Sequence, residues 1–402
     1  MGNENAWRLS LSPRAWQITA LELWRREHRG VVSVVTGGGK TVFAEMCILD
    51  FMTTAVAPRI VVLVPTLALL DQWYVALKDE LGVREEELGT YSGEGRPDSP
   101  KLINLVVLNT GRTVAPVLAS GDTENLLIVD ECHRAGSPEN AKALLGAYRA
   151  TLGLSATPER EYDPGFAELV QPRIGSVIYE YDYQTARKDE VIAPFDLINV
   201  EVSLTDPERI KYDRITRAIA RRRRADGEAS DQRLEALLRR RASVVATAAM
   251  RIPTAVKLVD LHRGERALIF HERVSDANVI SSLLNGRGHS VAVYHTGISP
   301  ELRRSNLMMF RRGMLDVLVC CRALDEGLNV PEATVGVIAS STASHRQRIQ
   351  RLGRILRPAR GKATASIYTI YATDLEERRL STEAASLQDV ASIRWLRASS
   401  NG

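Results

Sequence analysis

The sequence predicts an α/β fold with two units, each built on a parallel β-sheet. Short apolar runs typical of buried strands alternate with helical patterns from residue 31 to about residue 157, and the alternation returns from residue 267 to residue 370. Polar or charged residues follow several of these runs directly, as expected where ligands bind over the carboxyl edge of a parallel sheet. A basic helical stretch without this alternation separates the two units and is predicted to be an insertion.

Length and composition set the broad class. The chain has 402 residues, of which 45% are hydrophobic and 25% charged, which is typical of a globular protein with two or three domains. Its four cysteines form neither a disulfide framework nor the paired spacing of a zinc site. The sequence shows no signal-peptide pattern and no apolar run of membrane length. We therefore expect a cytoplasmic protein that does not act at a membrane.

The stretch from Val31 to Thr41 reads V-V-S-V-V-T-G-G-G-K-T and predicts a strand, a glycine-rich loop and a helix that begins near Lys40. The glycines let the loop backbone curl around an anion, and a helix N-terminus favours phosphate. Lys40 would supply a mobile positive charge, and the Thr41 hydroxyl could hold Mg²⁺. Val34 stands where the strict phosphate-loop pattern has glycine, so the alternative is a plain turn between strand and helix.

Apolar patterns extend the first unit on both sides of this loop. They predict an amphipathic helix around Ile18 to Trp24, a helix over residues 69–77 with Trp73 on its buried face, and strands at residues 60–64, 102–108 and 126–129.

The last of these strands ends in Asp130 and Glu131. Magnesium-assisted phosphoryl transfer uses one carboxylate at the metal and a second that orients the attacking water. The alternative for an acidic pair at a strand end is an N-cap of the next helix. The upstream phosphate loop favours the catalytic interpretation.

The segment Thr205 to Glu208 predicts a capping box that opens a helical stretch to about residue 260. Residues 208 to 241 contain 12 basic and 6 acidic side chains. The runs 221–224 and 239–241 suggest an arm that lies along a DNA backbone. A solvated helical hairpin is the alternative.

The second unit has predicted strands at residues 267–270, 291–294, 317–319 and 367–370 and no phosphate loop. A predicted helix over residues 350–357 places Gln350, Arg354 and Arg357 on one face, because they are spaced i, i+4 and i+7. A solvated arginine-rich helix is the alternative. The first unit carries a phosphate cradle and the second carries aligned arginines. This combination favours a site that the two units share.

In chain order, the motifs T-G-G-G-K-T, P-T, D-E-C-H, S-A-T, Y-H-T-G, D-E-G-L-N-V-P and Q-R-L-G-R-I-L-R resemble the motif series of superfamily 2 helicases and translocases. The resemblance covers residues 14 to about 372, and it is strongest to the XPB-like DNA branch. It implies two tandem RecA-like domains, with ATP and Mg²⁺ as cofactors. We expect these domains at residues 1–178 and 179–380, with the helical insertion at 205–260 and a C-terminal tail at 381–402.

The resemblance also implies roles for single residues. The implied catalytic residues are Lys40, Asp130, Glu131 and two arginine fingers, Arg354 and Arg357. The implied nucleotide contacts are Gln17, which would read adenine, Thr36, Gly37, Gly38, Gly39, Lys40, Thr41, Gly327, Asn329 and Gln350. Thr41 and Asp130 would hold Mg²⁺, and His133, Ser155 and Thr157 would couple the nucleotide state to domain movement. The expected nucleic-acid contacts are Thr66, Thr110 and Thr296, joined on grounds of charge by Arg221, Arg222, Arg223 and Arg224.

The favoured interpretation is an ATP-dependent DNA helicase or double-stranded DNA translocase that grips the DNA backbone in repair, restriction or defence. We expect a bare motor that acts with a separate nuclease or accessory protein. An RNA helicase is the second interpretation, and it is disfavoured because L-A-L-L-D-Q follows Pro65-Thr66 and the acidic motif ends in C-H. The third is a nucleotide-gated DNA-binding scaffold with little turnover, which would not need the water-activating Glu131.

Overall fold

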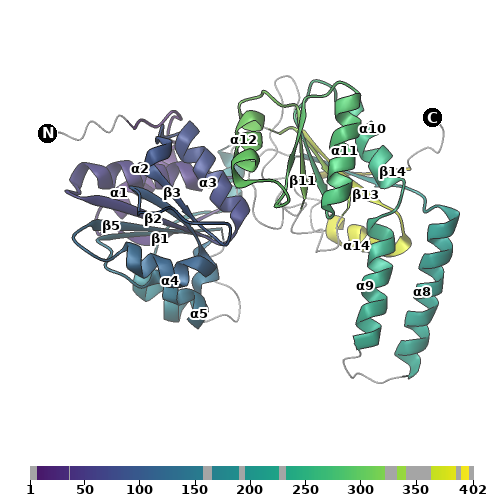
Figure 1. Ribbon diagram of the computed structural model, residues 1–402, viewed down its shortest axis with the longest axis horizontal. Coiled ribbons are helices and arrows are strands. Elements are labelled where there is room, and N and C mark those ends of the chain that lie inside the picture. The colour runs from purple at the N-terminus through teal and green to yellow at the C-terminus, as the bar shows by residue number, and fades with distance from the viewer. Residues whose placement is uncertain are drawn as a thin grey trace. The chain divides into compact units, whose positions relative to one another are not determined.

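The computed structural model describes residues 7–35, 37–156, 165–189, 195–225, 232–321, 333–340, 364–385 and 391–397. The described residues divide into two compact units, one made of residues up to 189 and one made of residues from 195 onward. Among the described residues, each unit contains one seven-stranded sheet, and the paired strands of each sheet run parallel (Figure 1). The predicted α/β fold with two parallel sheets is confirmed.

In the first sheet, one strand separates the strand that leads into the phosphate loop from the strand that ends in the acidic pair. Its order is β3 (Leu88–Tyr91), β4 (Ile103–Val107), β2 (Pro58–Val64), β5 (Glu124–Asp130), β6 (Ala150–Ser155), β1 (Arg29–Val34) and β7 (Val177–Tyr181). The helices of this unit are α1 (Ala15–Trp24), α2 (Lys40–Thr54), α3 (Leu67–Asp79), α4 (Leu108–Leu118), α5 (Pro138–Ala141), α6 (Gln171–Ile174) and α7 (Tyr183–Lys188). Because the strands are parallel, the ends of β1, β5 and β6 lie at one edge of the sheet.

Two local details differ from the sequence prediction. Ile18 was expected on the apolar face of α1, but its side chain is 50% exposed, and the buried face includes Trp16 and Gln17 instead. The strand predicted to end at Leu108 ends at Val107, and Thr110 lies in the first turn of α4. Trp73 is fully buried on α3, as predicted.

The second sheet has the order β10 (Val291–Tyr294), β11 (Val317–Cys321), β9 (Ala267–His271), β12 (Val335–Ile338), β13 (Ala365–Tyr371), β8 (Phe195–Glu201) and β14 (Ala391–Arg397). Its helices are α8 (Asp206–Ala225), α9 (Gln232–Ala246), α10 (Arg251–Leu261), α11 (Val274–Gly286), α12 (Pro300–Arg311) and α14 (Asp374–Ala385). The four strands predicted for this unit are present, with ends that differ by a few residues.

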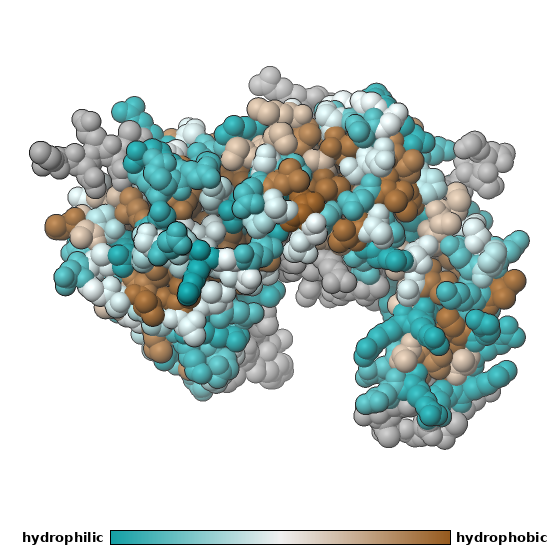
Figure 2. Space-filling model, in the orientation of Figure 1, coloured by the Kyte–Doolittle hydropathy of each residue, from teal (hydrophilic) through white to brown (hydrophobic). Residues whose placement is uncertain are grey.

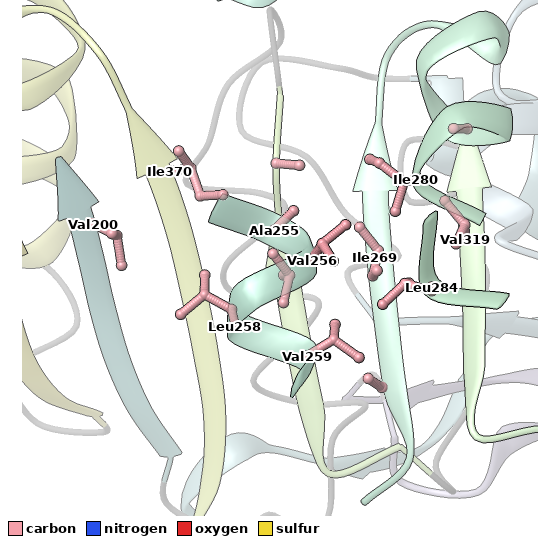
Figure 3. Packing of buried hydrophobic residues seen from close by; sticks show 14 of the residues in the cluster. Val200, Ala255, Val256, Leu258, Val259, Ile269, Ile280, Leu284, Val319 and Ile370 are labelled. Carbon is pink, nitrogen blue, oxygen red and sulfur yellow. The ribbon is translucent and has the colours of Figure 1, made fainter. Parts of the chain in front are cut away.

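Helix α10 belongs to the core of the second unit. Figure 3 shows Ala255, Val256 and Val259 of α10 among the apolar side chains of the sheet, including Ile269 of β9 and Ile370 of β13. These side chains are almost completely buried, and burying each valine or isoleucine among them contributes about 1.5–3 kcal/mol to stability. The predicted insertion at residues 205–260 therefore includes a core helix, and only α8 and α9 form a separate helical element.

The unit boundaries also differ from those predicted. The predicted boundary after residue 178 falls inside β7, which pairs with β1 and so belongs to the first sheet. Within the segment predicted to be a C-terminal tail, residues 391–397 form β14, which pairs with β8 along its whole length.

Helices α8 and α9 pack against each other as a hairpin (Figure 1). The seam between them contains the buried Ile215, Ile219 and Val244. At the base, the Glu208 carboxylate accepts from the Thr205 backbone N–H at 2.9 Å, as the capping box predicts, and from the Ala249 N–H at 2.9 Å. No single helix of the described residues is long and apolar enough to span a membrane. Only the bent pair α9–α10, taken together, reaches that length and hydropathy.

Candidate nucleotide-binding site

The phosphate loop follows β1, and its glycines are required by both backbone conformation and space. Gly37 and Gly39 have φ values of 81° and 100°, in the left-handed region that other residues rarely adopt. A Cβ on Gly38 would lie 2.6 Å from the Val34 side chain and 3.0 Å from the Val35 carbonyl oxygen. Lys40 begins α2 directly after the loop, as predicted. The loop can therefore present backbone N–H groups and a helix N-terminus to an anion.

Two adjacent side chains of α1 hold the loop from one side. The Trp16 Nε1–H donates to the Gly38 carbonyl at 3.1 Å, and the Gln17 Nε2–H donates to the Gly39 carbonyl at 2.8 Å. Gln17 is almost completely buried, and its Oε1 accepts from the Arg14 backbone N–H at 2.7 Å. Gln17 therefore bridges the start of α1 and the phosphate loop, while its role in reading adenine stays a prediction.

Lys40 and Glu131 approach each other across the carboxyl edge of the first sheet. The Lys40 Nζ lies 3.6 Å from Glu131 Oε1 and donates to the Val34 carbonyl at 3.3 Å. Glu131 has φ 49° and ψ 49°, a left-handed conformation that costs a non-glycine residue about 1–2 kcal/mol. Strained backbone of this kind is common at functional sites, where the surrounding structure enforces it. The fold thus holds this carboxylate next to the lysine at the phosphate loop.

Asp130 ends β5, and its carboxylate is buried. Its Oδ2 accepts from the Trp73 indole N–H at 2.9 Å, and its Oδ1 accepts from the Glu131 backbone N–H at 2.9 Å. Burial and the neighbouring Glu131 charge raise the pKa of Asp130 to about 6, while Lys40 and the two hydrogen bonds act to lower it. A cation bound at Asp130 would relieve this crowding of negative charge.

His133 links the acidic pair to the end of the next strand. Its Nδ1 lies 3.0 Å from the Ser155 Oγ and 3.5 Å from Glu131 Oε2. Ser155 is fully buried at the end of β6, which neighbours β5. The structure thus connects Lys40, Glu131, His133 and Ser155 through side-chain contacts at one sheet edge.

The predicted nucleic-acid contacts occupy different settings. Thr66 is the N-cap of α3, where its hydroxyl accepts from the Leu69 N–H at 3.3 Å. Thr110 is half-buried in the first turn of α4, and Thr296 is exposed after β10 in the second unit. Arg221 is exposed on α8 and Arg222 is half-buried. Contact of any of them with nucleic acid stays a prediction.

Several predicted site residues lie outside the described part of the chain, so their roles also stay predictions. They are Thr36, Thr157, Gly327, Asn329, Gln350, Arg354 and Arg357, together with the side chains of Arg223 and Arg224.

Two tryptophans contribute contacts to the site that the sequence did not reveal. Trp16 donates to the loop, and its ring packs between those of Phe43, Tyr179 and Tyr181 at centroid distances of 5.6, 6.0 and 5.4 Å. Trp73 donates to Asp130. In sequence, each is an apolar residue on a helix face, and the direction of its N–H depends on how that helix packs.

Comparison with known families agrees with this geometry. Residues 10–160 match the family described as the res subunit of type III restriction enzymes, and residues 250–359 match the helicase conserved C-terminal domain. The phosphate loop and the acidic pair fall within the first match.

Solved structures of low identity share the fold. The chain matches Saccharomyces cerevisiae Dbp5 bound to RNA and ADP with BeF3 at a TM-score of 0.62 and 15% identity, over 96% of this chain and 90% of Dbp5. It matches the Pyrococcus furiosus Hef helicase domain at a TM-score of 0.51 and 16% identity, over 93% of this chain and 98% of that domain. These similarities support the predicted pair of RecA-like domains.

Curated relatives are more similar in sequence. The DNA 3'-5' translocase XPB2 of Sulfurisphaera tokodaii is 30% identical over 363 residues, which cover 86% of this chain and 78% of that protein. The DNA 3'-5' helicase XPB of Kineococcus radiotolerans is 27% identical over 93% of this chain, but the match spans 62% of that protein. With this identity over most of its length, and with the helicase conserved C-terminal domain matched in the second unit, the chain belongs to the XPB-like branch of superfamily 2 helicases and translocases.

Proposed function

We propose that this protein is an ATP-dependent motor on DNA, acting as a double-stranded DNA translocase or helicase. Its family supports ATP hydrolysis that depends on nucleic acid, and the relatives that match most of the chain are named as DNA enzymes. The single observation that carries the chemistry is the contact between Lys40 of the phosphate loop and Glu131 of the acidic motif. A binding scaffold has no use for a carboxylate held in this position.

Each side chain of the cluster has a specific task in hydrolysis. Lys40 neutralises charge on the phosphates, and the loop N–H groups orient them. Glu131 accepts a hydrogen bond from the attacking water and takes its proton as the water oxygen bonds to the γ-phosphorus, while the bond from that phosphorus to the bridging oxygen breaks and ADP leaves. His133, between Glu131 and Ser155, can transmit a change at Glu131 to the end of β6.

Mg²⁺ fits the residues at this site. Asp130 supplies a carboxylate whose negative charge is crowded by Glu131, and the half-buried Thr41 supplies a hydroxyl in the first turn of α2. The described residues contain no cluster of three or more acidic, histidine or cysteine side chains arranged to hold a metal. Two protein groups are enough for Mg²⁺, which commonly binds through one or two of them plus phosphate oxygens and waters. Bound there, it would neutralise phosphate charge.

The choice of DNA over RNA is tested by ATP hydrolysis with a panel of nucleic acids. We expect duplex DNA to accelerate hydrolysis more than duplex or single-stranded RNA of the same length. The comparison needs a fixed salt concentration, because phosphate contacts make binding salt-dependent. Greater acceleration by RNA would favour the RNA helicase instead, and equal hydrolysis with and without every nucleic acid would favour a scaffold.

We further propose that the α8–α9 hairpin contacts the DNA backbone. Figure 2 shows hydrophilic side chains along both helices and an apolar strip between them. Arg214, Arg217 and Arg221 are exposed and spaced i, i+3 and i+7, so they lie on one face of α8. Tyr212 packs at the seam, where the Arg241 guanidinium lies 6.0 Å from its ring centroid. An exposed row of charge without exposed aromatic rings favours contact with phosphates over base stacking.

Neutralising this row should reduce the salt dependence of DNA binding. In a variant with Arg217→Ala and Arg221→Ala, the slope of log affinity against log salt should become shallower by about 2, because each lost phosphate contact releases about 0.9 fewer counterions. Binding would be measured by fluorescence anisotropy at several salt concentrations.

The matched control carries Arg378→Ala and Arg379→Ala, which removes the same charge from exposed positions on α14 of the same unit. Its salt slope should stay near that of the unmodified protein. If the hairpin variant and the α14 variant change the salt slope equally, the change comes from the lower net charge and not from a contact of the hairpin with DNA. If neither changes it, the hairpin has a structural role or binds a protein.

A further inference from the structure

Trp73 makes a contact with the candidate site that core packing does not require. Its indole is fully buried on α3, and its Nε1–H donates to Asp130 Oδ2 at 2.9 Å across 57 residues of sequence. Helix α3 packs against β2 and β4, and β2 is hydrogen-bonded to β5, which ends at Asp130. The packing of α3 on this part of the sheet therefore determines where the indole N–H points.

We propose that Trp73 is a positioning residue that holds the Asp130 carboxylate in the orientation needed for Mg²⁺. This inference rests on the proposed function, because it assigns the metal to Asp130. The indole holds Oδ2, and the Glu131 backbone N–H holds Oδ1 at 2.9 Å. A carboxylate has about four lone-pair sites, so two donors fix its plane and leave acceptor positions for a metal-bound water.

A second buried tryptophan shows that a buried indole N–H does not need a carboxylate as its acceptor. Trp24 on α1 is also fully buried, and its Nε1–H donates at 2.9 Å to the backbone carbonyl of Thr151. A neutral carbonyl is sufficient to satisfy a buried indole. Trp73 instead donates to a side-chain carboxylate, which gives a charge-assisted hydrogen bond about twice as strong as a neutral one.

The hydrogen bond from Trp73 also favours the charged form of the Asp130 carboxylate, whose surroundings disfavour a negative charge. Asp130 is buried beside Glu131, and both effects disfavour its negative charge. A donor aimed at one oxygen offsets part of that penalty. Partners that orient a metal-binding side chain in this way commonly contribute about 10- to 100-fold to metal affinity.

The test compares ADP binding with and without Mg²⁺ in Trp73→Phe and Trp24→Phe. Phenylalanine keeps an aromatic ring and removes the N–H donor. In Trp73→Phe, the gain in ADP affinity on adding Mg²⁺ should fall by about tenfold or more, while ADP affinity in excess EDTA stays unchanged. In Trp24→Phe, both affinities should stay near those of the unmodified protein. Isothermal titration calorimetry measures these affinities without hydrolysis or DNA.

The proposal would be overturned if Mg²⁺ raised the ADP affinity of Trp73→Phe as much as that of the unmodified protein. It would also be overturned if Trp24→Phe lost as much of this gain in ADP affinity as Trp73→Phe. A double-mutant cycle with Asp130→Asn adds a further condition. If Trp73 acts through Asp130, adding Trp73→Phe to Asp130→Asn should not reduce any further the gain in ADP affinity that Mg²⁺ provides. A further loss would assign the effect of Trp73 to general packing.

A measurement on the unmodified protein covers the case in which Trp73→Phe does not fold. The chain has five tryptophans, so ¹⁵N-tryptophan labelling gives at most five indole N–H signals. Substitutions at the other four positions identify the Trp73 signal by exclusion. Adding Mg²⁺ to the ADP complex should shift this signal and leave that of Trp24 in place, and an unmoved Trp73 signal would overturn the proposal. ADP binding that ignores Mg²⁺ altogether would overturn the metal site, although DNA-stimulated ATP hydrolysis would still test the motor function separately.

Discussion

Glu131→Gln should bind ATP with nearly normal affinity and lose most of its turnover. Glutamine keeps the size and hydrogen-bonding reach of the side chain, but it cannot accept the proton of the attacking water. General-base catalysis of this kind contributes about 10²- to 10⁴-fold, so kcat should fall by about that factor. Steady-state ATP hydrolysis with saturating DNA measures the loss, and binding of a fluorescent ATP analogue measures the affinity.

Lys40→Ala provides the contrast for this experiment. Lys40 lies 3.6 Å from Glu131 in the structure and would contact the phosphates themselves, so its removal should weaken ATP binding as well as turnover. The two variants would then separate a residue that binds from a residue that reacts. Turnover of Glu131→Gln close to that of the unmodified protein would remove Glu131 from the role of general base.

Arg251→Met should strongly destabilise the second unit. Arg251 is almost fully buried at the start of α10, and its guanidinium donates to the carbonyls of Val245, Ala339 and Ile370 and to Glu376 Oε1 at 2.6 Å. Methionine would leave the carboxylate without its countercharge and three carbonyls without this donor. Breaking a buried ion pair in this way costs about 3–5 kcal/mol. For a domain of this size that corresponds to a melting temperature lower by about 6–20 °C, measured by differential scanning calorimetry.

Arg239→Met is the matched control. Arg239 pairs with Glu235 at 2.7 Å on the surface of α9, where both side chains are exposed. Such a pair contributes about 0.3–0.5 kcal/mol, so the melting temperature should change little. Adding Glu376→Gln to Arg251→Met should recover part of the stability, because the uncompensated charge is then absent. A loss in Arg251→Met no larger than that in Arg239→Met would contradict the assignment of Arg251 as a structural anchor.

The sequence by itself determined the fold class and the placement of the acidic motif and the phosphate loop. Apolar runs predicted β1, β2 and β5, because strands buried on both faces are apolar along their whole length. The glycines and Lys40 predicted the loop and the start of α2, since few residue types tolerate that backbone. Asp130 and Glu131 were assigned to a site because polar residues that follow such strands must lie at the carboxyl edge.

Tertiary structure alone decided which residues support these groups. The short strands β3 and β12 and the edge strands β7 and β14 were not predicted, since little in their local sequence shows whether a neighbouring strand will accept their hydrogen bonds. Helix α10 shares its helical pattern with α8 and α9, and only packing on β9 and β13 makes it part of the core. Trp73 was predicted to be buried, but hydrophobic periodicity specifies the face of a helix and not the direction of one N–H bond. That direction follows from how α3 packs against the sheet, which depends on contacts between residues far apart in the chain.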